Sequence, residues 1–219
     1  MLEKIRAANP GKTIRSICDE SFLKYGKVYQ NLDISELADK VREKYDIIGS
    51  GVFYTPSILE AEDTAAAKRV SMAVYGGLPI EVGCCCGKND ALNAFEYHVG
   101  SEITYAVTDL VLILGLATDI KDGSYDTKNA EFFFVPKDTV FELYPVALHF
   151  APCSANQDGF MTVVCLLKGT NTPLPEGSHE KALFMTNKWL ICHPDDKADL
   201  DQGAALGLTG ENLRLVIPE

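Results

Sequence analysis

The sequence predicts an α+β protein that is mainly β: an antiparallel β-sandwich or barrel carrying an N-terminal helical segment. Three regions of different character indicate this. Residues 1–70 contain segments with helical periodicity, residues 71–195 are short alternating or apolar runs separated by turns, and residues 196–219 have little periodicity. With 219 residues, of which 47% are hydrophobic, the chain can bury a core without disulfides or metals. We therefore expect one structural domain that ends in a short C-terminal tail.

Two helices are expected within residues 1–70. Residues 32–46, LDISELADKVREKYD, offer Asp33 as an N-cap with a glutamate three residues later, and their apolar residues repeat at three and four. Residues 57–70 are rich in alanine and glutamate, and Ser57 is a candidate N-cap. We expect this helical segment to pack on the β-region.

The β-region, residues 71–195, has the pattern of an antiparallel fold. Runs such as DLVLILGLA, AEFFFVPKDTVFELYP and GFMTVVCLLKG are separated by Gly-Gly, Lys-Asn-Asp, Lys-Asp-Gly and Asn-Gln-Asp-Gly turns. The runs follow one another too closely to leave room for crossover helices, so neighbouring strands are expected to be antiparallel.

The acidic composition limits the classes of partner. The formal net charge is −11 and the pI is about 4.8, and no cluster of Lys and Arg offsets this. We therefore expect no nucleic-acid partner and no membrane partner, and a small-molecule substrate instead. The N-terminal residues lack the apolar stretch of a signal peptide, and no window approaches the roughly 18–20 apolar residues of a membrane span. These features predict a cytoplasmic protein.

The seven cysteines form no C-x-x-C pair, so neither a zinc ribbon nor a thioredoxin motif is indicated. In a reducing cytosol they are expected to be free thiols. Cys84, Cys85 and Cys86 are consecutive, and neighbouring strand residues point to opposite faces. We interpret them as small buried apolar residues; the sequence assigns them no further role.

Two stretches contain candidate metal ligands. In NAFEYHVGSEI, the residues Glu96, His98 and Glu102 have the same parity and would share one face of a strand. About fifty residues later, His149 lies in the apolar context YPVALHFAPC. Taken separately, the first stretch also fits a solvated strand face and the second a satisfied core histidine. Two carboxylates facing one pocket would require a cation, however, and this favours a shared metal site.

Together the two stretches resemble the motifs of the cupin superfamily. The first motif corresponds to Glu96-x-His98-x(3)-Glu102 followed by a strand ending at Gly115, and the second runs from Pro136 to His149. The sequence departs from the usual motif at Glu96, where a histidine is common. Residues 90–170 are also similar to the ureidoglycolate lyase-like branch, and the whole chain resembles a bacterial cupin-like family of unknown function. The resemblance implies a jelly-roll β-barrel.

The resemblance also implies a chemistry. Glu96, His98, Glu102 and His149 would bind a divalent ion, and this ligand set suits Mn, Fe or Zn. Such an ion acts as a Lewis acid on a small hydroxy-carbonyl compound, such as a sugar, a sugar acid or a ureidoglycolate-like hydroxy acid. Isomerisation, epimerisation or lyase cleavage would follow.

Glu142 and Tyr144 precede His149 on the same expected strand, which makes them candidates for proton transfer. Their alternative roles are those of a surface glutamate and a tyrosine at the edge of the core. Further candidates are less specific: His179 and His193 are expected in loops.

Two other functions remain open from the sequence. The same barrel could bind a sugar or another small molecule without turning it over, in which case the pocket needs no titratable group beside it. It could also be a degenerate barrel acting as an oligomer scaffold, with its cavity filled by apolar side chains. The chain carries no DNA-binding segment, which favours the enzyme over a sensor. Exposed edge strands often pair, so a homodimer is expected.

The ends of the expected barrel carry three polar candidates. Lys88 and Asn89 immediately precede the motif strand and are expected to be turn residues close to the barrel mouth. Lys188, beside the single tryptophan of the chain, is expected to cover one end of the barrel.

Overall fold

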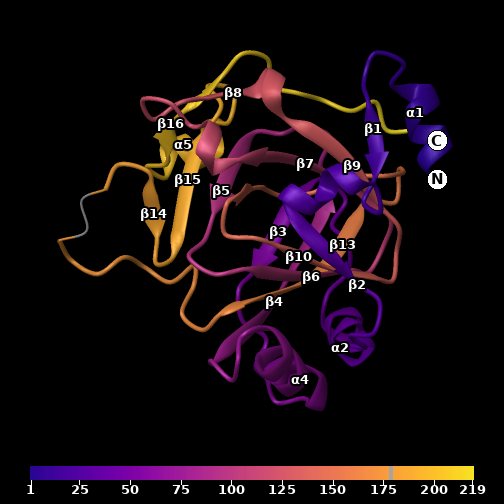
Figure 1. Cartoon of the computed structure of the whole chain (residues 1–219), viewed down its shortest axis with the longest axis vertical. Coiled ribbons are helices and arrows are strands. Elements are labelled where there is room, and N and C mark those ends of the chain that lie inside the picture. Colours follow the sequence, from indigo (N-terminus) through magenta and orange to yellow (C-terminus); the bar gives the residue numbers. More distant parts are fainter. Residues whose placement is uncertain (178–179) are drawn as a thin grey trace.

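The computed structural model describes residues 1–177 and 180–219. Two β-sheets pack against each other, helices cover the outer face of the larger sheet, and a smaller sheet closes one end (Figure 1). In order, the six-stranded sheet contains β2 (Gly26–Tyr29), β10 (Thr139–Leu143), β6 (Glu102–Ala106), β13 (Phe160–Leu167), β4 (Ile80–Lys88) and β3 (Gly51–Thr55). The five-stranded sheet contains β1 (Ile14–Ser16), β9 (Glu131–Val135), β7 (Leu110–Leu116), β11 (Ala147–Leu148) and β12 (Cys153–Ser154).

The remaining elements lie around these two sheets. The small sheet contains β14 (Leu183–Met185), β15 (Lys188–Cys192), β16 (Ala205–Leu206) and β5 (Ala94–Tyr97), and β8 (Tyr125–Asp126) pairs with β17 (Leu208–Thr209). The helices are α1 (Leu2–Ala8), α2 (Ser35–Lys44), α3 (Leu59–Glu62), α4 (Ala65–Val74) and α5 (Lys197–Asp201), with short 3-10 turns η1 (Glu20–Lys24), η2 (Ala117–Asp119) and η3 (Thr127–Asn129). Both chain ends lie beside α1 (Figure 1).

A tight turn sets the pairing of the central strands. Asp122 and Gly123 both have positive φ, +50° and +75°, which is the backbone of a type I′ turn. Lys121 and Ser124 flank it and exchange two backbone hydrogen bonds of 2.8 and 2.9 Å. Asp-Gly is a favoured sequence for this turn because both residues tolerate the left-handed region. The local sequence therefore fixes a hairpin at this point of the chain.

The two arms of this hairpin stay paired far from the turn. Moving outward, the opposed pairs are Lys121–Ser124, Ile113–Phe132, Thr104–Phe141 and Glu96–His149. Between successive pairs both arms advance by the same number of residues. The outer parts, β6 and β10, enter the six-stranded sheet, while the inner parts, β7 and β9, enter the five-stranded sheet. A long hairpin rolled between two sheets in this way is the jelly-roll arrangement.

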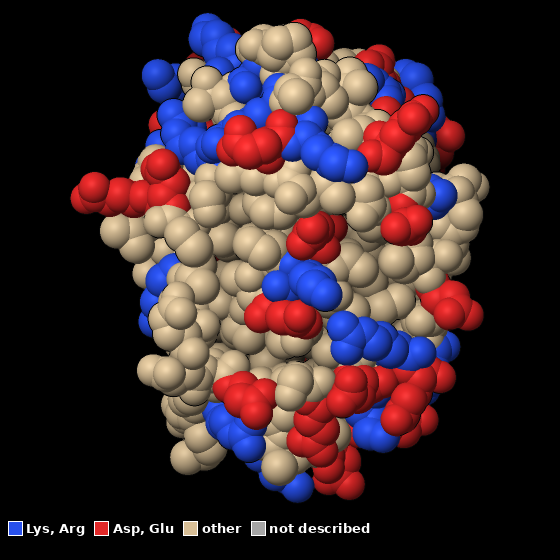
Figure 2. Space-filling model, turned by 90° about the vertical axis from the view of Figure 1, so that its right-hand side faces the viewer, with Lys and Arg blue, Asp and Glu red and all other residues tan. Residues whose placement is uncertain are grey.

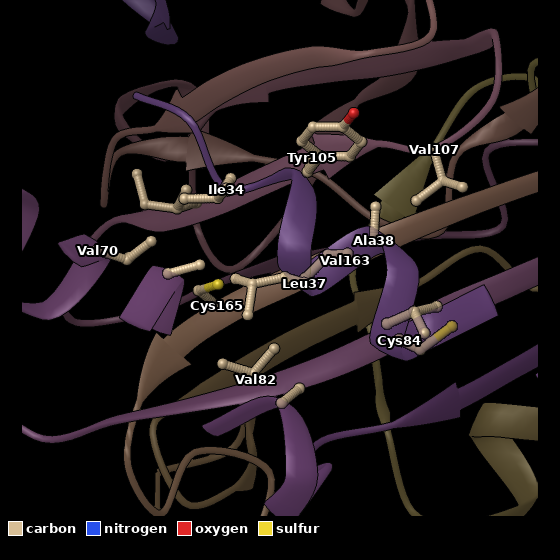
Figure 3. Packing of buried hydrophobic residues seen from close by; sticks show 14 of the residues in the cluster. Ile34, Leu37, Ala38, Val70, Val82, Cys84, Tyr105, Val107, Val163 and Cys165 are labelled. Carbon is tan, nitrogen blue, oxygen red and sulfur yellow. The ribbon is translucent and has the colours of Figure 1, made fainter. Parts of the chain in front are cut away.

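Two apolar clusters stabilise the layers. The inner faces of the two sheets meet through residues such as Leu112, Phe133 and Phe141. On the outer face of the six-stranded sheet, α2 and α4 bury residues such as Leu37 and Val70 against β4, β6 and β13 (Figure 3). Burial of this apolar surface supplies the main stabilisation of the fold.

The three consecutive cysteines on β4 alternate between these clusters. Cys84 and Cys86 face the helices, and Cys85 faces the interior between the sheets. All three are free thiols and are buried, which confirms their interpretation as small apolar core residues.

The N-terminal segment differs from the expectation of mainly helical structure. It contributes strands β1, β2 and β3 as well as helices, because runs such as TIRS and GVFYT are rich in β-branched and aromatic residues and extend the sheets at their edges. The expected helix over 57–70 is two helices, α3 and α4, since the Thr64 side chain accepts a hydrogen bond from Ala67 N and starts a new helix. The expected C-terminal tail likewise contains α5, β16 and β17.

Charged residues are mixed on the surface. Figure 2 shows acidic and basic side chains interspersed over one face, without a continuous basic area there. No helix in the described part of the chain combines the length and the apolar character needed to cross a membrane.

Candidate metal centre

The first motif is folded over a turn and does not lie on one strand. Glu96 belongs to β5 of the small sheet, His98 follows that strand, and Glu102 opens β6 of the six-stranded sheet. Gly100, with φ of +120°, reverses the chain between them. The three residues therefore do not share one strand, and the expectation that strand parity aligns their side chains is wrong. The turn nevertheless brings Glu102 Oε2 to 3.8 Å from His98 Nε2.

The rolled hairpin places the second motif directly against the first. Glu96 N donates to His149 O at 2.6 Å, and His149 N donates to Glu96 O at 3.0 Å. The His149 ring then lies 5.3 Å from the His98 ring, and its Nε2 is 3.3 Å from Glu102 Oε2. All four sequence-predicted ligands thus meet in one place, from segments about fifty residues apart.

Both imidazole rings are oriented by backbone carbonyls. His98 Nδ1 lies 2.7 Å from Asn187 O, and His149 Nδ1 lies 2.9 Å from Ala147 O. A carbonyl oxygen can only accept, so each Nδ1 carries the proton, and in a neutral ring Nε2 is left with a free lone pair. Among the described residues, both Nε2 atoms are buried and make no hydrogen bond. Carbonyl contacts of this kind orient metal-binding histidines in proteins.

The donor set fits a divalent ion. Ligand atoms of Glu96, His98 and His149 all lie within 4.8 Å of one another, and Glu102 Oε2 is 3.8 and 3.3 Å from Nε2 of His98 and His149. Thr104 Oγ1 donates to Glu102 Oε1 at 2.8 Å and fixes that carboxylate. Two imidazoles with one or two carboxylates suit Mn, Fe or Zn.

Electrostatics at the centre are dominated by burial and by the two opposite charges. Burial lowers the pKa of His149, but the adjacent Glu102 and Glu96 carboxylates outweigh this effect and raise it to about 9. Burial raises the pKa of Glu102, yet the His149 and His98 rings bring it down to about 2. Burial is the main cause of a lowered pKa at His98. The two carboxylates therefore hold negative charge that attracts a cation.

A lysine that was not predicted as a site residue joins the cluster. Lys188 opens β15, which pairs with β5, and its Nζ contacts Glu96 Oε2. Burial raises the pKa of Glu96, but the Lys188 ammonium outweighs this effect and lowers it. The neighbouring Trp189 stacks on Tyr97 at 5.5 Å and holds the two strands together. Lys188 therefore lies inside the site, where the sequence indicated only a cover at one end.

The centre opens into a cavity of about 470 Å³ between the sheets. Its apolar wall contains Leu112, Phe141, Leu143, Val164 and Leu166. Lys88 and Asn89 line the cavity, consistent with their expected place beside the mouth. Asp196 and Asp199, at the start of α5 and within it, also line it. Burial and the Asp196 carboxylate raise the pKa of Asp199 to about 6, which is suitable for proton transfer near neutral pH.

The two sequence candidates for proton transfer lie away from this cavity. Glu142 is on β10, and its neighbours Phe141 and Leu143 line the cavity, so alternation points Glu142 to the opposite face. There its carboxylate accepts hydrogen bonds from the Tyr29 and Ser101 hydroxyls at 2.7 and 2.6 Å. Tyr144 is half-buried and is also outside the cavity lining. Strand parity is the physical reason for this correction.

Of the two remaining histidines, the structure describes His193, which lies outside the centre. His193 is buried just after β15, where its ring contacts Gly210 O and Asp195 N. His179, expected in a loop, lies outside the described residues.

Residues 14–213 match the family described as "Domain of unknown function (DUF4867)". The chain belongs to the DUF4867 family. No curated protein matches this DUF4867 chain. The family description assigns no chemistry, so the site of this DUF4867 protein has to be read from its own residues.

Several solved structures are weakly similar to this chain. A variant of Bacillus subtilis oxalate decarboxylase is 12% identical, with a TM-score of 0.34 over 58% of this chain and 28% of the other. A second variant of that enzyme is 14% identical, with a TM-score of 0.35 over 82% and 41%. A cupin-like protein from Thermotoga maritima is 11% identical, with a TM-score of 0.29 over 54% and 70%. This DUF4867 chain spans less than half the length of the oxalate decarboxylase chains, and likenesses at these scores carry no argument about its chemistry.

The fold itself is α+β, mainly β, with a jelly-roll arrangement of its strands, and the membership of the cupin superfamily that the sequence motifs imply stays a prediction. The strands that the structure describes form a sandwich and do not close into the expected barrel. The similarity to the ureidoglycolate lyase-like branch, the homodimer and the cytoplasmic location stay predictions.

Proposed function

We propose that the protein is a metal-dependent enzyme that acts on a small hydroxy-carbonyl compound. The observation that carries the proposal is the pair of buried, unpartnered Nε2 atoms of His98 and His149 beside the Glu102 carboxylate, at one end of a cavity. A bound cation would satisfy both nitrogens at once, and at His149 it would replace the proton that the pKa of about 9 keeps on the ring in the metal-free protein. His98, Glu102 and His149 would hold the ion, with Glu96 as a fourth ligand.

When bound, a divalent ion would polarise the carbonyl and hydroxyl oxygens of such a compound. The apolar wall would exclude water from the reacting carbon and strengthen the electrostatic interactions around it. Asp199, with a pKa of about 6, would accept the proton from the carbon next to the carbonyl and return it. Isomerisation and epimerisation share this proton transfer, whereas lyase cleavage of a carbinol would begin with loss of the hydroxyl proton.

Two features favour an enzyme over the alternative functions. A scaffold would fill its interior with apolar side chains, yet here a cavity of about 470 Å³ ends at charged groups. A binding module needs no titratable residue beside its ligand, yet Lys188 and Asp199 both line the cavity. Perturbed titratable groups in a cleft are a common property of catalytic sites.

The first experiment measures metal content. Purified protein is loaded with Mn²⁺, Fe²⁺ or Zn²⁺, dialysed and analysed by mass spectrometry, beside the Glu102→Gln and His98→Ala variants. We expect close to one ion per chain in the wild type and a large loss in both variants. His193→Ala is the matched control, because it removes a buried histidine that lies outside the centre. Absence of metal in the loaded wild type would refute the proposal.

The second experiment tests the chemistry. Pools of aldoses, ketoses and 2-hydroxy acids are incubated in D₂O with the metal-loaded protein and followed by proton NMR. Reversible proton transfer exchanges the hydrogen on the carbon next to the carbonyl for deuterium, and cleavage gives new signals. We expect a change in at least one pool with the wild type and none with Glu102→Gln. A loaded protein that leaves every pool unchanged would point to binding alone.

A further inference from the structure

Lys188 is fixed against the metal centre by its own strand. Its side chain is 14% exposed, with Nζ on Glu96 Oε2 and 5.8 Å from the centre of the Phe150 ring. The preceding residue, Asn187, accepts from His98 Nδ1 through its backbone carbonyl and from Val99 N through its side chain, at 2.7 and 2.8 Å. The Asn187–Lys188 pair therefore binds the same turn that carries His98. The backbone from which the Lys188 side chain starts is therefore fixed against the centre.

The ammonium group of Lys188 has bonding capacity that its known partner does not use. A lysine carries three N–H donors; among the described residues its Nζ contacts Glu96, and the Asp199 carboxylate lies close enough to interact with it electrostatically. An ion held by His98 and His149 would share Glu96 with Lys188 and draw the carboxylate charge towards itself. A buried ammonium in that position is stabilised by a further anionic group within the cavity.

Among the described residues, some polar side chains of the cavity wall are already engaged, and the unpartnered polar atoms on residues that line it include Asn171 Oδ1 and Asp196 Oδ2. The Asn89 side chain donates to Ala91 O and Ala151 O, and Thr162 Oγ1 donates to Cys85 O. These polar residues line the cavity but are already engaged with the protein. A small ligand with one charged, oxygen-rich end fits a cavity that has an apolar wall and one buried ammonium at the candidate metal centre.

We propose that the substrate is a small 2-hydroxy- or 2-oxocarboxylate and that Lys188 binds its carboxylate beside the ion. The inference deepens the proposed function and rests on it. The neighbouring hydroxyl or carbonyl oxygen of the ligand would face the ion, while the carboxylate pairs with the ammonium. Charge-assisted hydrogen bonds of this kind are about twice as strong as neutral ones, so Lys188 selects acids over neutral compounds of the same size.

The test compares an acid with a neutral analogue. Glycolate and dihydroxyacetone are titrated calorimetrically into Mn²⁺-loaded protein, and the metal content of every sample is measured. In the wild type we expect glycolate to bind about tenfold more tightly or better. Lys188→Met should lose that preference while its affinity for dihydroxyacetone stays within about twofold. Lys88→Met is the matched control, because Lys88 lines the same cavity but is exposed at its mouth.

The variants also separate the two proposals. Removal of Lys188 alone leaves the Glu96 carboxylate without its cation, so the Glu96→Gln/Lys188→Met double variant is measured as well. Unchanged glycolate affinity in metal-containing Lys188 variants would overturn the inference and leave the metal site standing. If the wild type takes up no metal, the proposed function fails, and glycolate is titrated into the metal-free protein. If metal-free wild type binds glycolate and the Lys188→Met variant does not, the result supports the carboxylate-binding role of Lys188. Equal affinity of the two proteins for glycolate overturns that role.

Discussion

Glu81 should make the protein less stable as the pH rises from about 4.5 to about 7. Its side chain lies on β4 and is 3% exposed, with Oε2 accepting from Gly169 N at 2.8 Å and Oε1 buried without a partner among the described residues. Burial raises the pKa of this carboxyl from 4.5 to about 7. Between these values the folded protein keeps the proton and the unfolded chain does not. Stability therefore falls with rising pH over this window and levels off above about pH 7.

The size of the effect follows from the pKa. A pKa difference of one corresponds to about 1.4 kcal/mol, so ionised Glu81 costs the folded state about 3 kcal/mol at pH 8. Urea denaturation at several pH values from 4.5 to 8.5 measures the free energy of unfolding for the wild type and for Glu81→Gln. The difference between the two curves should change by about 3 kcal/mol across the window. Glu20→Gln, at an exposed glutamate, is the control. A wild-type curve parallel to that of Glu81→Gln would refute the reasoning.

Three further predictions concern the site and the fold. If Asp199 accepts the proton as a carboxylate, kcat/KM rises with pH to about 6 and then levels off. The Asp199→Asn variant should exchange deuterium about 10²-fold more slowly than the wild type, or slower still. An exchange rate equal to that of the wild type would exclude this role. In the Gly115→Ala variant the new Cβ would lie 2.7 Å from the Tyr125 ring, so the free energy of unfolding, measured by urea titration, should drop by about 1–3 kcal/mol. In the control Gly11→Ala the new Cβ has no atom within 4 Å, so the free energy of unfolding should change little. The His149→Ala variant should keep the wild-type circular dichroism spectrum, because the core is independent of the centre. Mn²⁺ at about 100 times its Kd should raise the free energy of unfolding of the wild type alone, by about 2.7 kcal/mol. An equal increase in both proteins would show that the ion binds elsewhere.

The meeting of Glu96, His98, Glu102 and His149 could be predicted from the sequence, although the expected single strand was not the cause; their role as metal ligands stays a proposal. Two carboxylates and a histidine within seven residues are a short-range pattern, and the close approach of Glu102 to His98 survives the turn at Gly100. His149 could be predicted because a histidine in an apolar run must find a partner. A strand assigned across residues 96–102 could not reveal that turn, since periodicity alone does not show where a short strand ends.

Lys188 and Asp199 could not be predicted as site residues from the sequence. Lys188 enters the cavity because β15 pairs with β5, and these strands are about ninety residues apart along the chain. Asp199 follows on α5 and lines the same cavity. No local pattern encodes a contact of that range. Glu142 was a candidate for proton transfer because it is close to His149 along the chain, but the parity of β10 turns its side chain to the other face of the sheet. Long-range strand pairing determines which residues lie in the site, whereas the periodicity of a single sequence indicates only local structure.

The equal arms of the rolled hairpin determine how the centre tolerates insertions. Glu96 is as many residues before Asp122 as His149 is after Gly123, so their pairing depends on a balance between the two arms. One residue added to a single arm would put a different side chain opposite Glu96 and turn the inserted arm over, carrying its ligand to the opposite face. One residue added to each arm would restore the pairing. The separation of the two motifs can therefore vary in length, provided that it grows symmetrically about the Asp-Gly turn.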